Sequence, residues 1–553
     1  MDPNSGVLAP SITSLNEDIL HLLVEAALLA NVLKPLSITS RQMRLYCLPY
    51  LFKESTVRSV VPVKPPVFLP ETVWSYVSVL HLVDRCLDQS VTHRFPDSPR
   101  SYLKFSKHAL LCGVYSTEYL SIALGSMPQL HTVTFCLAAD YDHGLPWSVL
   151  IGICSLPKLQ NVTITNLHLV PTLLPDETLA IETPISRLIS FHHTLSDYRH
   201  HRDRQYPSEE RALELLLGAS RDTLERLTLP MDCAPLVWVC NQLPWPRLRE
   251  LRLRGELRTI GIPPFPLISM FSNMPGLRVL ELKLAQPEGR DPQAFWPPSH
   301  RAISWPWPEL DELTLSCPQV HDRVYAALPS SLRSLTLRYT PHYRNYTAKR
   351  VYHITPAARW QWPLLSSSDM LQILRQCRLP DLRHLSLEYH ESDADDELLQ
   401  YIASTYPALR CLRLFCCRRD EAEEPLGDPV IIVEHIANQL APMQHLTRLD
   451  LQLDLPGMPK PTTSVAMMRS GAFERIGHKV ATLNAWHKTQ QAMVDRLLSV
   501  LSPTLSTIKL WTPASFTVHD WAVYEVVRAG DELHTHMRLE RPVKRSPFLS
   551  PYS

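Results

Sequence analysis

Glycine is scarce in this sequence, with only 15 residues among 553. Loops that cradle phosphate groups need several glycines at fixed spacing, and none of the glycine-rich nucleotide-binding strings occurs; the His-Glu-x-x-His string of metalloproteases is also absent. The twelve cysteines form no Cys-x-x-Cys pair, so the common zinc motifs are missing and no disulfide framework is indicated. We therefore expect no metal, no cofactor and no catalytic residues, and hence not an enzyme.

The chain also lacks an excess of charge of either sign, because 55 Lys and Arg residues balance 55 Asp and Glu residues. A nucleic-acid-binding protein normally carries a basic excess, so no nucleic-acid partner is expected. The longest apolar run, residues 22–33, is interrupted by Glu25 and is too short to cross a bilayer. No basic and then apolar signal opens the sequence, so we expect a protein of the cytoplasm or nucleus, with reduced thiols and no membrane partner.

Residues 11–58 predict a small helical module. A Ser-x-x-Glu capping box stands at residues 14–17. The apolar residues after it, at positions 19, 22, 23, 26 and 27, have the i, i+3, i+4 spacing of a helix with one apolar face. Further apolar groups follow at residues 33–38 and 43–52. About 45 residues are near the lower limit for an independent core. The pattern alone therefore predicts a module that forms an interface.

Three strings of this module resemble an F-box: Ser11-Ile-Thr-Ser-Leu-Asn-Glu-Asp-Ile-Leu-His-Leu-Leu23, Leu36-Ser-Ile-Thr-Ser-Arg-Gln-Met-Arg44 and Leu48-Pro-Tyr-Leu-Phe52. Asn16 stands where the family usually has proline, and the apolar spacer at Ala26 to Leu33 is long. The resemblance implies docking on the small adaptor subunit of a cullin-type (SCF) ubiquitin ligase. The adaptor contacts that it implies are Leu15, Ile19, Leu23, Leu36, Leu48, Pro49 and Phe52.

Leucine is abundant, with 88 residues, and much of it recurs as Leu-x-x-Leu-x-Leu. Clear copies of this pattern begin at Leu224, Leu248, Leu277, Leu310, Leu332, Leu382, Leu409 and Leu446. Weaker copies begin at Val77, Leu130, Leu159, Leu188, Val480 and Leu505. From Leu130 onward, successive copies begin 22 to 50 residues apart. This pattern resembles the leucine-rich-repeat family with irregular insertions.

In an extended segment alternate residues share a face, so the last two leucines of each copy point to one side. Stacking the copies in parallel buries these leucines, and the intervals leave room for the crossover that parallel neighbours need. We predict an α/β fold in which a short helical module precedes a leucine-rich-repeat solenoid, with parallel strands on the concave face and helices and loops on the convex face. The predicted parts are a tail (1–10), the F-box-like module (11–58), a proline-rich connector (59–72), the repeat array (73–540) and a second tail (541–553).

An F-box followed by irregular leucine-rich repeats implies the substrate-recognition subunit of a ubiquitin ligase, which binds the adaptor through the F-box and a target protein through the repeats. The alternative is a non-catalytic repeat scaffold for protein–protein interaction with no ligase role. The identity of the target stays open, as does any requirement for its phosphorylation.

The residue between the two inner leucines of each copy faces the other way, which predicts a polar ladder. Its members are Thr228, Arg252, Glu281, Thr314, Thr336, Ser386, Arg413 and Asp450. A solvated sheet face explains this ladder as well as a binding site does. The binding hypothesis is a site for an acidic or phosphorylated target segment, because guanidinium groups pair with carboxylate or phosphate through two hydrogen bonds. The candidate target-binding residues are Arg249, Arg252, Arg254, Glu281, Arg413 and Asp450.

Overall fold

A computed structural model places most of the chain in two compact units. The first unit comprises Met1–Leu195 and Leu215–Ser220, and the second comprises Ser196–Glu214 and Arg221–Ser553. The extent of the array from residue 73 to 540 stays a prediction. The described residues are 16–59, 68–84, 117–137, 143–170, 179–195, 207–241, 244–257, 266–286, 291–299, 304–340, 364–418, 427–459, 472–515, 518–529 and 532–540.

The first unit opens with three helices, α1 (Glu17–Leu29), α2 (Leu33–Ser37) and α3 (Arg41–Phe52). Asn16 caps α1, since its side-chain oxygen accepts a hydrogen bond from the Asp18 amide at 3.2 Å. The predicted capping box is therefore wrong in its position: Glu17 is the first helical residue, and Asn16 takes the capping role. Ser14 lies outside the described residues.

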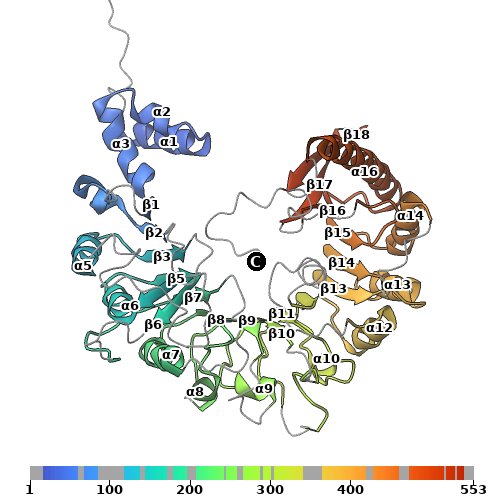
Figure 1. The fold of residues 1–553 in the computed structure, drawn as a ribbon, viewed down its shortest axis with the longest axis horizontal. Helices are drawn as coiled ribbons and strands as arrows, with labels where there is room; N and C mark the ends of the chain where they lie inside the picture. Colours follow the sequence, from blue (N-terminus) through green and yellow to red (C-terminus); the bar gives the residue numbers. More distant parts are fainter. Residues whose placement is uncertain are drawn as a thin grey trace, which may run out of the picture. The chain divides into compact units, whose positions relative to one another are not determined.

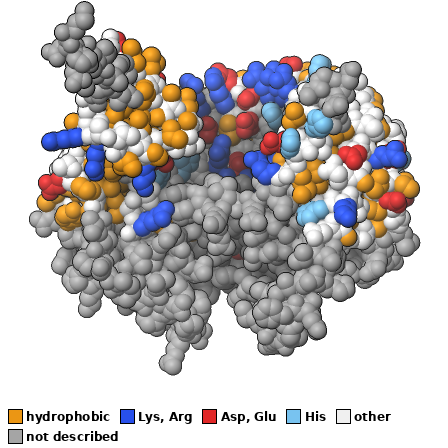
Figure 2. Space-filling model, turned by 90° about the horizontal axis from the view of Figure 1, so that it is seen from above, with side chains coloured by type: hydrophobic (Ala, Val, Ile, Leu, Met, Phe, Trp, Pro, Cys, Tyr) orange, Lys and Arg blue, Asp and Glu red, His pale blue; other side chains and the backbone are white. Residues whose placement is uncertain are grey.

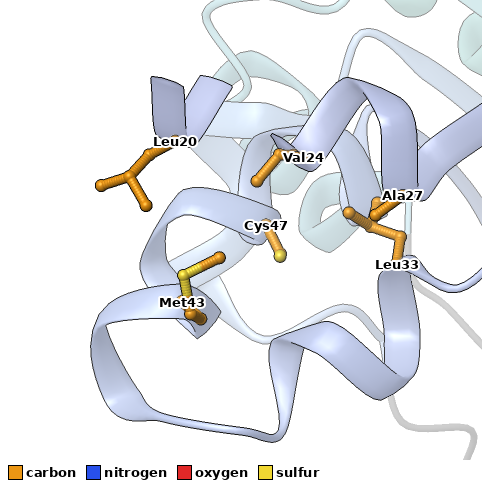
Figure 3. Packing of buried hydrophobic residues seen from close by; sticks show 6 residues of the cluster. All are labelled: Leu20, Val24, Ala27, Leu33, Met43 and Cys47. Carbon is orange, nitrogen blue, oxygen red and sulfur yellow. The ribbon is translucent and has the colours of Figure 1, made fainter. Parts of the chain in front are cut away.

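These helices enclose a small apolar core, shown in Figure 3. Its buried members are Leu20, Val24 and Ala27 of α1, Leu33 of α2, and Met43 and Cys47 of α3. The α1 members follow the spacing i, i+4, i+7, which keeps them on one helix face. The sequence analysis assigned the whole apolar run of residues 19–27 to one face, whereas α1 has apolar residues on two faces and buries only this one.

A parallel sheet follows in the first unit, in the order β1-β2-β3-β5-β7. Its strands are β1 (Glu54–Ser59), β2 (Val79–Asp84), β3 (Thr132–Leu137), β5 (Asn161–Thr165) and β7 (Ser190–Thr194). The intervening elements are η2 (Glu71–Tyr76), α5 (Thr117–Gly125), β4 (His143–Pro146), α6 (Trp147–Cys154) and β6 (Leu167–Val170). Strands β4 and β6 form a separate parallel pair.

Strand β1 lies inside the range that the sequence analysis gave to the helical module. Helix α3 ends at Phe52, and Glu54 already pairs with Val79 of β2. The helical part therefore ends near residue 52, and the predicted boundary at residue 58 is wrong. The reason is visible in the sequence, since the segment from Ser55 to Val57 is rich in residues that favour strands and buries Ser55 and Val57 alternately.

The second unit contains the eight clear copies of the leucine pattern, and each of them forms a strand. These strands are β8 (Arg226–Pro230), β9 (Glu250–Glu256), β10 (Val279–Ala285), β11 (Glu312–Leu315), β12 (Ser334–Leu337), β13 (His384–His390), β14 (Cys411–Cys417) and β15 (Arg448–Leu453). Neighbours in this order pair in parallel. Both inner leucines of every copy are buried, from Leu227 to Leu451. The predicted strand register is confirmed.

Helices and turns connect the strands of this unit, and Figure 1 shows α12, α13 and α14 on one side of β13, β14 and β15. The connecting helices are α8 (Leu236–Asn241), α9 (Leu267–Met270), α10 (Val324–Ala327), α12 (Ser367–Gln376), α13 (Asp395–Thr405) and α14 (Pro429–Leu440); α7 (Pro207–Ser220) spans the division between the units. Helix α12 begins with a capping box of Ser366 and Asp369, which the sequence analysis missed.

The parallel pattern ends near the C-terminal end of the described chain. Helix α16 (Ala472–Val500) contains the weak copy at Val480, so that copy is wrong. Strand β16 (Thr507–Ser515) extends the parallel sheet from β15. The next strands, β17 (Val518–Ala529) and β18 (Glu532–Glu540), pair antiparallel because only a short connection joins each to the strand before it. The described chain is therefore α/β, with a leucine-rich-repeat-like parallel array and an antiparallel end.

Candidate functional site

Helix α1 carries a second apolar stripe that faces away from the module core. Its residues, Ile19, Leu22, Ala26 and Leu29, follow the spacing i, i+3, i+7, i+10, and all four are exposed. Leu22 leaves 65% of its surface exposed. A helix with apolar residues on two faces is usually covered by other protein on both faces. The outer stripe of α1 therefore has the character of a surface that binds a partner.

Exposed apolar side chains also occur on and beside the other two helices of the module. Ile38, after α2, is 79% exposed, and Figure 2 shows hydrophobic side chains gathered over the N-terminal helices. Within the described part of the chain, seven of the thirteen exposed large hydrophobic side chains belong to this module. Such a concentration marks an interaction site more often than chance exposure. We call these seven residues the module's apolar surface: Ile19, Leu22, Leu28, Leu29, Val32, Ile38 and Leu45.

The residues predicted to contact the adaptor fall into different environments. Ile19 belongs to the apolar surface, and Pro49 is exposed. Leu23 and Leu36 pack against the module core and are half-buried. The remaining predicted contacts are Leu48 and Phe52, which are half-buried, and Leu15, which lies outside the described residues.

The sequence analysis did not propose Leu29, Ile38 or Leu45 as contacts. For α1 a signal existed, since Leu22 and Leu29 continue the helical spacing that starts at Ile19. For Ile38 no signal existed, because it follows the last turn of a five-residue helix, where periodicity says little about exposure.

The predicted polar ladder forms a continuous row on the second unit's sheet. Its members are aligned strand by strand in the order Thr228, Arg252, Glu281, Thr314, Thr336, Ser386, Arg413 and Asp450, and Lys509 of β16 continues it. Because they alternate with buried leucines, they face the side of the sheet opposite the leucine core. We call this side the polar face of the second unit.

One charged cluster on the polar face lies on β9 and β10. Arg254 Nε lies 2.7 Å from Glu281 Oε1, and Lys283 Nζ lies 3.3 Å from Glu281 Oε2. Arg252 lies 3.3 Å from Glu250. Burial alone would raise the pKa of Glu281, but Lys283 and Arg254 outweigh burial and hold this pKa below its usual value. Three cations of this cluster therefore share two carboxylates.

A second charged cluster lies on β12 to β15. Arg448 holds Asp450 with two hydrogen bonds, Nε to Oδ1 at 2.8 Å and Nη2 to Oδ2 at 2.7 Å. Arg413 Nε lies 2.9 Å from Asp450 Oδ2. Arg338 follows β12; its Nε lies 3.7 Å from the buried carboxylate of Glu388, and its guanidinium carbon lies 3.6 Å from the ring centre of Phe415.

The predicted target-binding residues therefore belong to two clusters. Arg252 and Arg413 are separated by five strand spacings, which is about 24 Å in a sheet. Arg249 is exposed in the turn before β9 and stands outside the row. A single site shared by Arg252 and Arg413 was expected, and the structure does not bring them together, because their strands are not neighbours.

The titratable groups of the described ranges suggest no metal centre. No group of three or more His, Cys, Asp or Glu side chains within these ranges could hold a metal ion. Most of the ten cysteines in the same ranges are buried. Burial raises the pKa of Cys136, Cys154 and Cys377 to about 12. These thiols are therefore protonated and unreactive in the folded chain.

No helix within the described ranges is long and apolar enough to cross a membrane.

The described elements define the class of this fold: a helical module comes first in the chain, and a leucine-rich-repeat-like α/β array follows it. No protein-family model matches the sequence, and no curated protein matches it. Among solved structures the chain is similar to TLR13 in the crystal structure of the TLR13–ssRNA13 complex, with 14% sequence identity and a TM-score of 0.28. The match covers 74% of this chain and 46% of that chain, so this chain matches less than half of TLR13's length. A match at this level says nothing about function.

Proposed function

We propose that the protein is the substrate-recognition subunit of a cullin-type ubiquitin ligase. Its helical module binds the small adaptor subunit, and its repeat array binds the target protein. The observation that carries this proposal is the module's apolar surface, whose seven exposed large hydrophobic side chains lie on three short helices or next to their ends.

The exposed apolar residues of the module support a protein partner with an apolar contact surface. Ile19, Leu22 and Leu29 offer a stripe along three turns of α1, and Leu45 on α3 adds a second contact. An apolar stripe of this kind associates by removing surface from water, at roughly 25 cal/mol per Å² buried. The resemblance of the three strings of residues 11–52 to an F-box supports the adaptor as that partner.

Asn16 replaces the proline that the F-box pattern usually has at this place. In the structure Asn16 caps α1 through its side-chain oxygen. Proline and a capping residue both favour a helix that starts here, since proline fixes φ and asparagine satisfies a free amide. The departure from the family pattern therefore leaves the start of the first helix intact.

The proposed receptor performs no chemistry. Its role is to hold a target beside the ligase, so that the effective concentration of target lysines rises at the site of ubiquitin transfer. The polar face of the second unit, with its aligned row from Thr228 to Lys509, is the proposed surface for the target.

The test is binding of the full-length protein to purified adaptor subunit. Leu22→Asp places a carboxylate in the proposed contact, where it would be buried without a partner. We expect this variant to lose at least about 100-fold in affinity, because several kcal/mol correspond to more than two factors of ten. Leu22 is exposed in the free protein, so the variant should unfold at the same temperature as the wild type.

The matched control is Ile122→Asp on α5. Ile122 is also largely exposed and apolar, but it lies outside the helical module. Adaptor binding should be unchanged in this variant. Failure of the wild-type protein to bind the adaptor, or equal binding by Leu22→Asp, would sink the ligase proposal and favour a repeat scaffold whose helices contact another protein.

A further inference from the structure

Strand β18 is the last strand of the second unit's sheet, and no other described strand pairs with its outer edge (Figure 1). The edge of a sheet presents backbone N–H and C=O groups that can bind another strand. Proteins usually protect such an edge by making it short, bulged or interrupted by proline. Strand β18 has nine residues, none of them proline, and it pairs with β17 without a shift in register. It is therefore a long and regular edge.

One hydrogen bond shows which backbone groups of β18 point outwards. The Val526 amide of β17 donates to the Ser506 carbonyl at 2.9 Å, so the backbone groups of Val526 point towards β16. Because these groups alternate along an antiparallel strand, those of Val527 point towards β18 and pair with His534. Those of Thr535, the next residue, point away from β17. By the same alternation the outward-pointing residues are Leu533, Thr535, Met537 and Leu539.

One face of β18 lies against helix α16. The side-chain nitrogen of Gln491 on α16 donates to Thr535 Oγ1 at 3.0 Å, and Met537 shares the face of Thr535 because it is two residues further along. Tyr524 stands directly opposite Met537 on β17 and is fully buried, whereas Met537 is 44% exposed. A strand added to β18 would cover Met537 from its outer side.

The sequence of β18 is complementary to itself in one antiparallel register. When the Thr535 residues of two β18 strands stand opposite each other, Glu532 of each strand stands opposite Arg538 of the other. Opposite charges at such positions stabilise a pair of strands, and like charges destabilise it. Registers shifted by two or four residues place Arg538 opposite His534 or His536 instead. Charge therefore favours the register centred on Thr535.

We propose that the protein forms a homodimer in which β18 pairs antiparallel with β18 of a second copy, about a two-fold axis at Thr535. A two-fold contact uses the same patch on both copies, so each favourable pair occurs twice. Leu533 and Met537 stand opposite each other in this register, and the backbone groups of both point to the shared edge. One strand is a small interface, so we expect a dissociation constant in the range of about 1 to 100 μM.

The first test is analytical ultracentrifugation of the full-length protein at concentrations that span this range. The wild type should change from monomer to dimer as its concentration rises. Arg538→Glu should weaken dimerisation at least about tenfold, because it places like charges opposite each other twice. Glu532→Arg should do the same, and the double variant should regain most of the lost affinity. Arg538 is largely exposed in the monomer, so Arg538→Glu should unfold at the wild-type temperature.

The second test locates the two-fold axis by disulfide formation. In the proposed register the two Thr535 Cα atoms lie about 5.5 Å apart, which suits a disulfide. Thr535→Cys should therefore form a covalent dimer under mild oxidation. The matched control is Met537→Cys, because Met537 of each copy lies four residues, about 13 Å along the strand, from the position opposite Met537 of the other. It should crosslink no more than the wild type, whose own cysteines give the background.

A protein that stays monomeric up to about 100 μM would overturn the dimer and leave the edge to another extended chain. Failure of the double charge variant to regain affinity, or equal crosslinking of Thr535→Cys and Met537→Cys, would overturn the register. The variant Leu22→Asp should dimerise as the wild type does. Loss of the dimer in Leu22→Asp would assign the contact between copies to the module's apolar surface and overturn the pairing of β18.

Discussion

The helical module and the second unit's repeat array use their apolar residues in opposite ways. Helix α1 has apolar side chains on two faces, and only Leu20, Val24 and Ala27 enter its core. In the array both inner leucines of every clear copy are buried, and the opposite face of the sheet is polar. The difference teaches that each repeat buries its leucines against the neighbouring repeats, whereas three short helices are too small to bury all of their apolar side chains.

The largest effect is expected at Glu388, whose carboxylate is fully buried in the array. Glu388 accepts a hydrogen bond from the Tyr339 amide at 3.1 Å and lies beside Arg338. Glu388→Ala should therefore destabilise the second unit by about 3–5 kcal/mol, because it removes a fully buried carboxylate that pairs with the half-buried Arg338 and accepts from the Tyr339 amide. Urea denaturation measures this change, with hydrogen exchange of β12 to β14 to localise it. The matched variant Glu388→Gln keeps an acceptor and should lose less. A loss below about 1 kcal/mol for Glu388→Ala would contradict the assigned contacts.

The leucine core of the array should show the next largest effect. Leu280 is fully buried on β10 between two neighbouring repeats. Leu280→Ala should cost roughly 2–5 kcal/mol, from lost burial and the cavity that it leaves. Urea denaturation again provides the measurement, and a loss below about half a kcal/mol would contradict the register, since that is the range of surface substitutions.

The two faces of α1 allow a comparison within one helix. Leu20 is buried in the module core and Leu22 is exposed, although both are leucines two positions apart. Leu20→Ala should cost about 2 kcal/mol, at the low end for such a change because a small core relaxes easily. Leu22→Ala should stay within about half a kcal/mol. Hydrogen exchange of α1 and α3 in the full chain distinguishes the two, and equal protection would mean that the two faces of α1 are wrongly assigned.

The smallest effect is expected from an ion pair at the edge of the array. Arg278 Nη2 lies 2.8 Å from Glu309 Oε2, and both side chains are about half exposed. Arg278→Ala should change stability by less than about 1 kcal/mol, and the change should shrink further at high salt. Thermal unfolding at low and high ionic strength checks this. A larger loss that salt does not reduce would show that the pair is not screened by solvent.

The strands of the array could be predicted from the sequence because each copy of the leucine pattern carries its own period of two. The copy at Val480 failed because its apolar spacing also fits a helix, and residues 472–500 contain many residues that favour helices. Strand β1 was missed because it has no such leucine pattern, and its short strand-favouring segment from Ser55 to Val57 was counted with the helices before it.

The candidate sites were less predictable than the fold. The sequence places Arg252, Ser386 and Arg413 in one row, since the row follows from the repeat itself. It does not say which arginine already has a carboxylate beside it. Glu281 belongs to Arg254 and Lys283, whereas Asp450 is held mainly by Arg448. Such pairings depend on neighbouring strands that are separated by insertions of variable length.

The buried cysteines give the chain a built-in set of probes for local opening. Cys136 lies on β3 and Cys154 at the end of α6, while Cys377 follows α12 and Cys417 ends β14. A thiol reagent reacts only with the thiolate, so each of these residues reacts when its own repeat opens and exposes it. Labelling rates at the four sites would therefore give the free energy of opening along the chain without any added label. Equal rates would mean that the repeats open together, and a gradient of rates would identify the repeat that opens first.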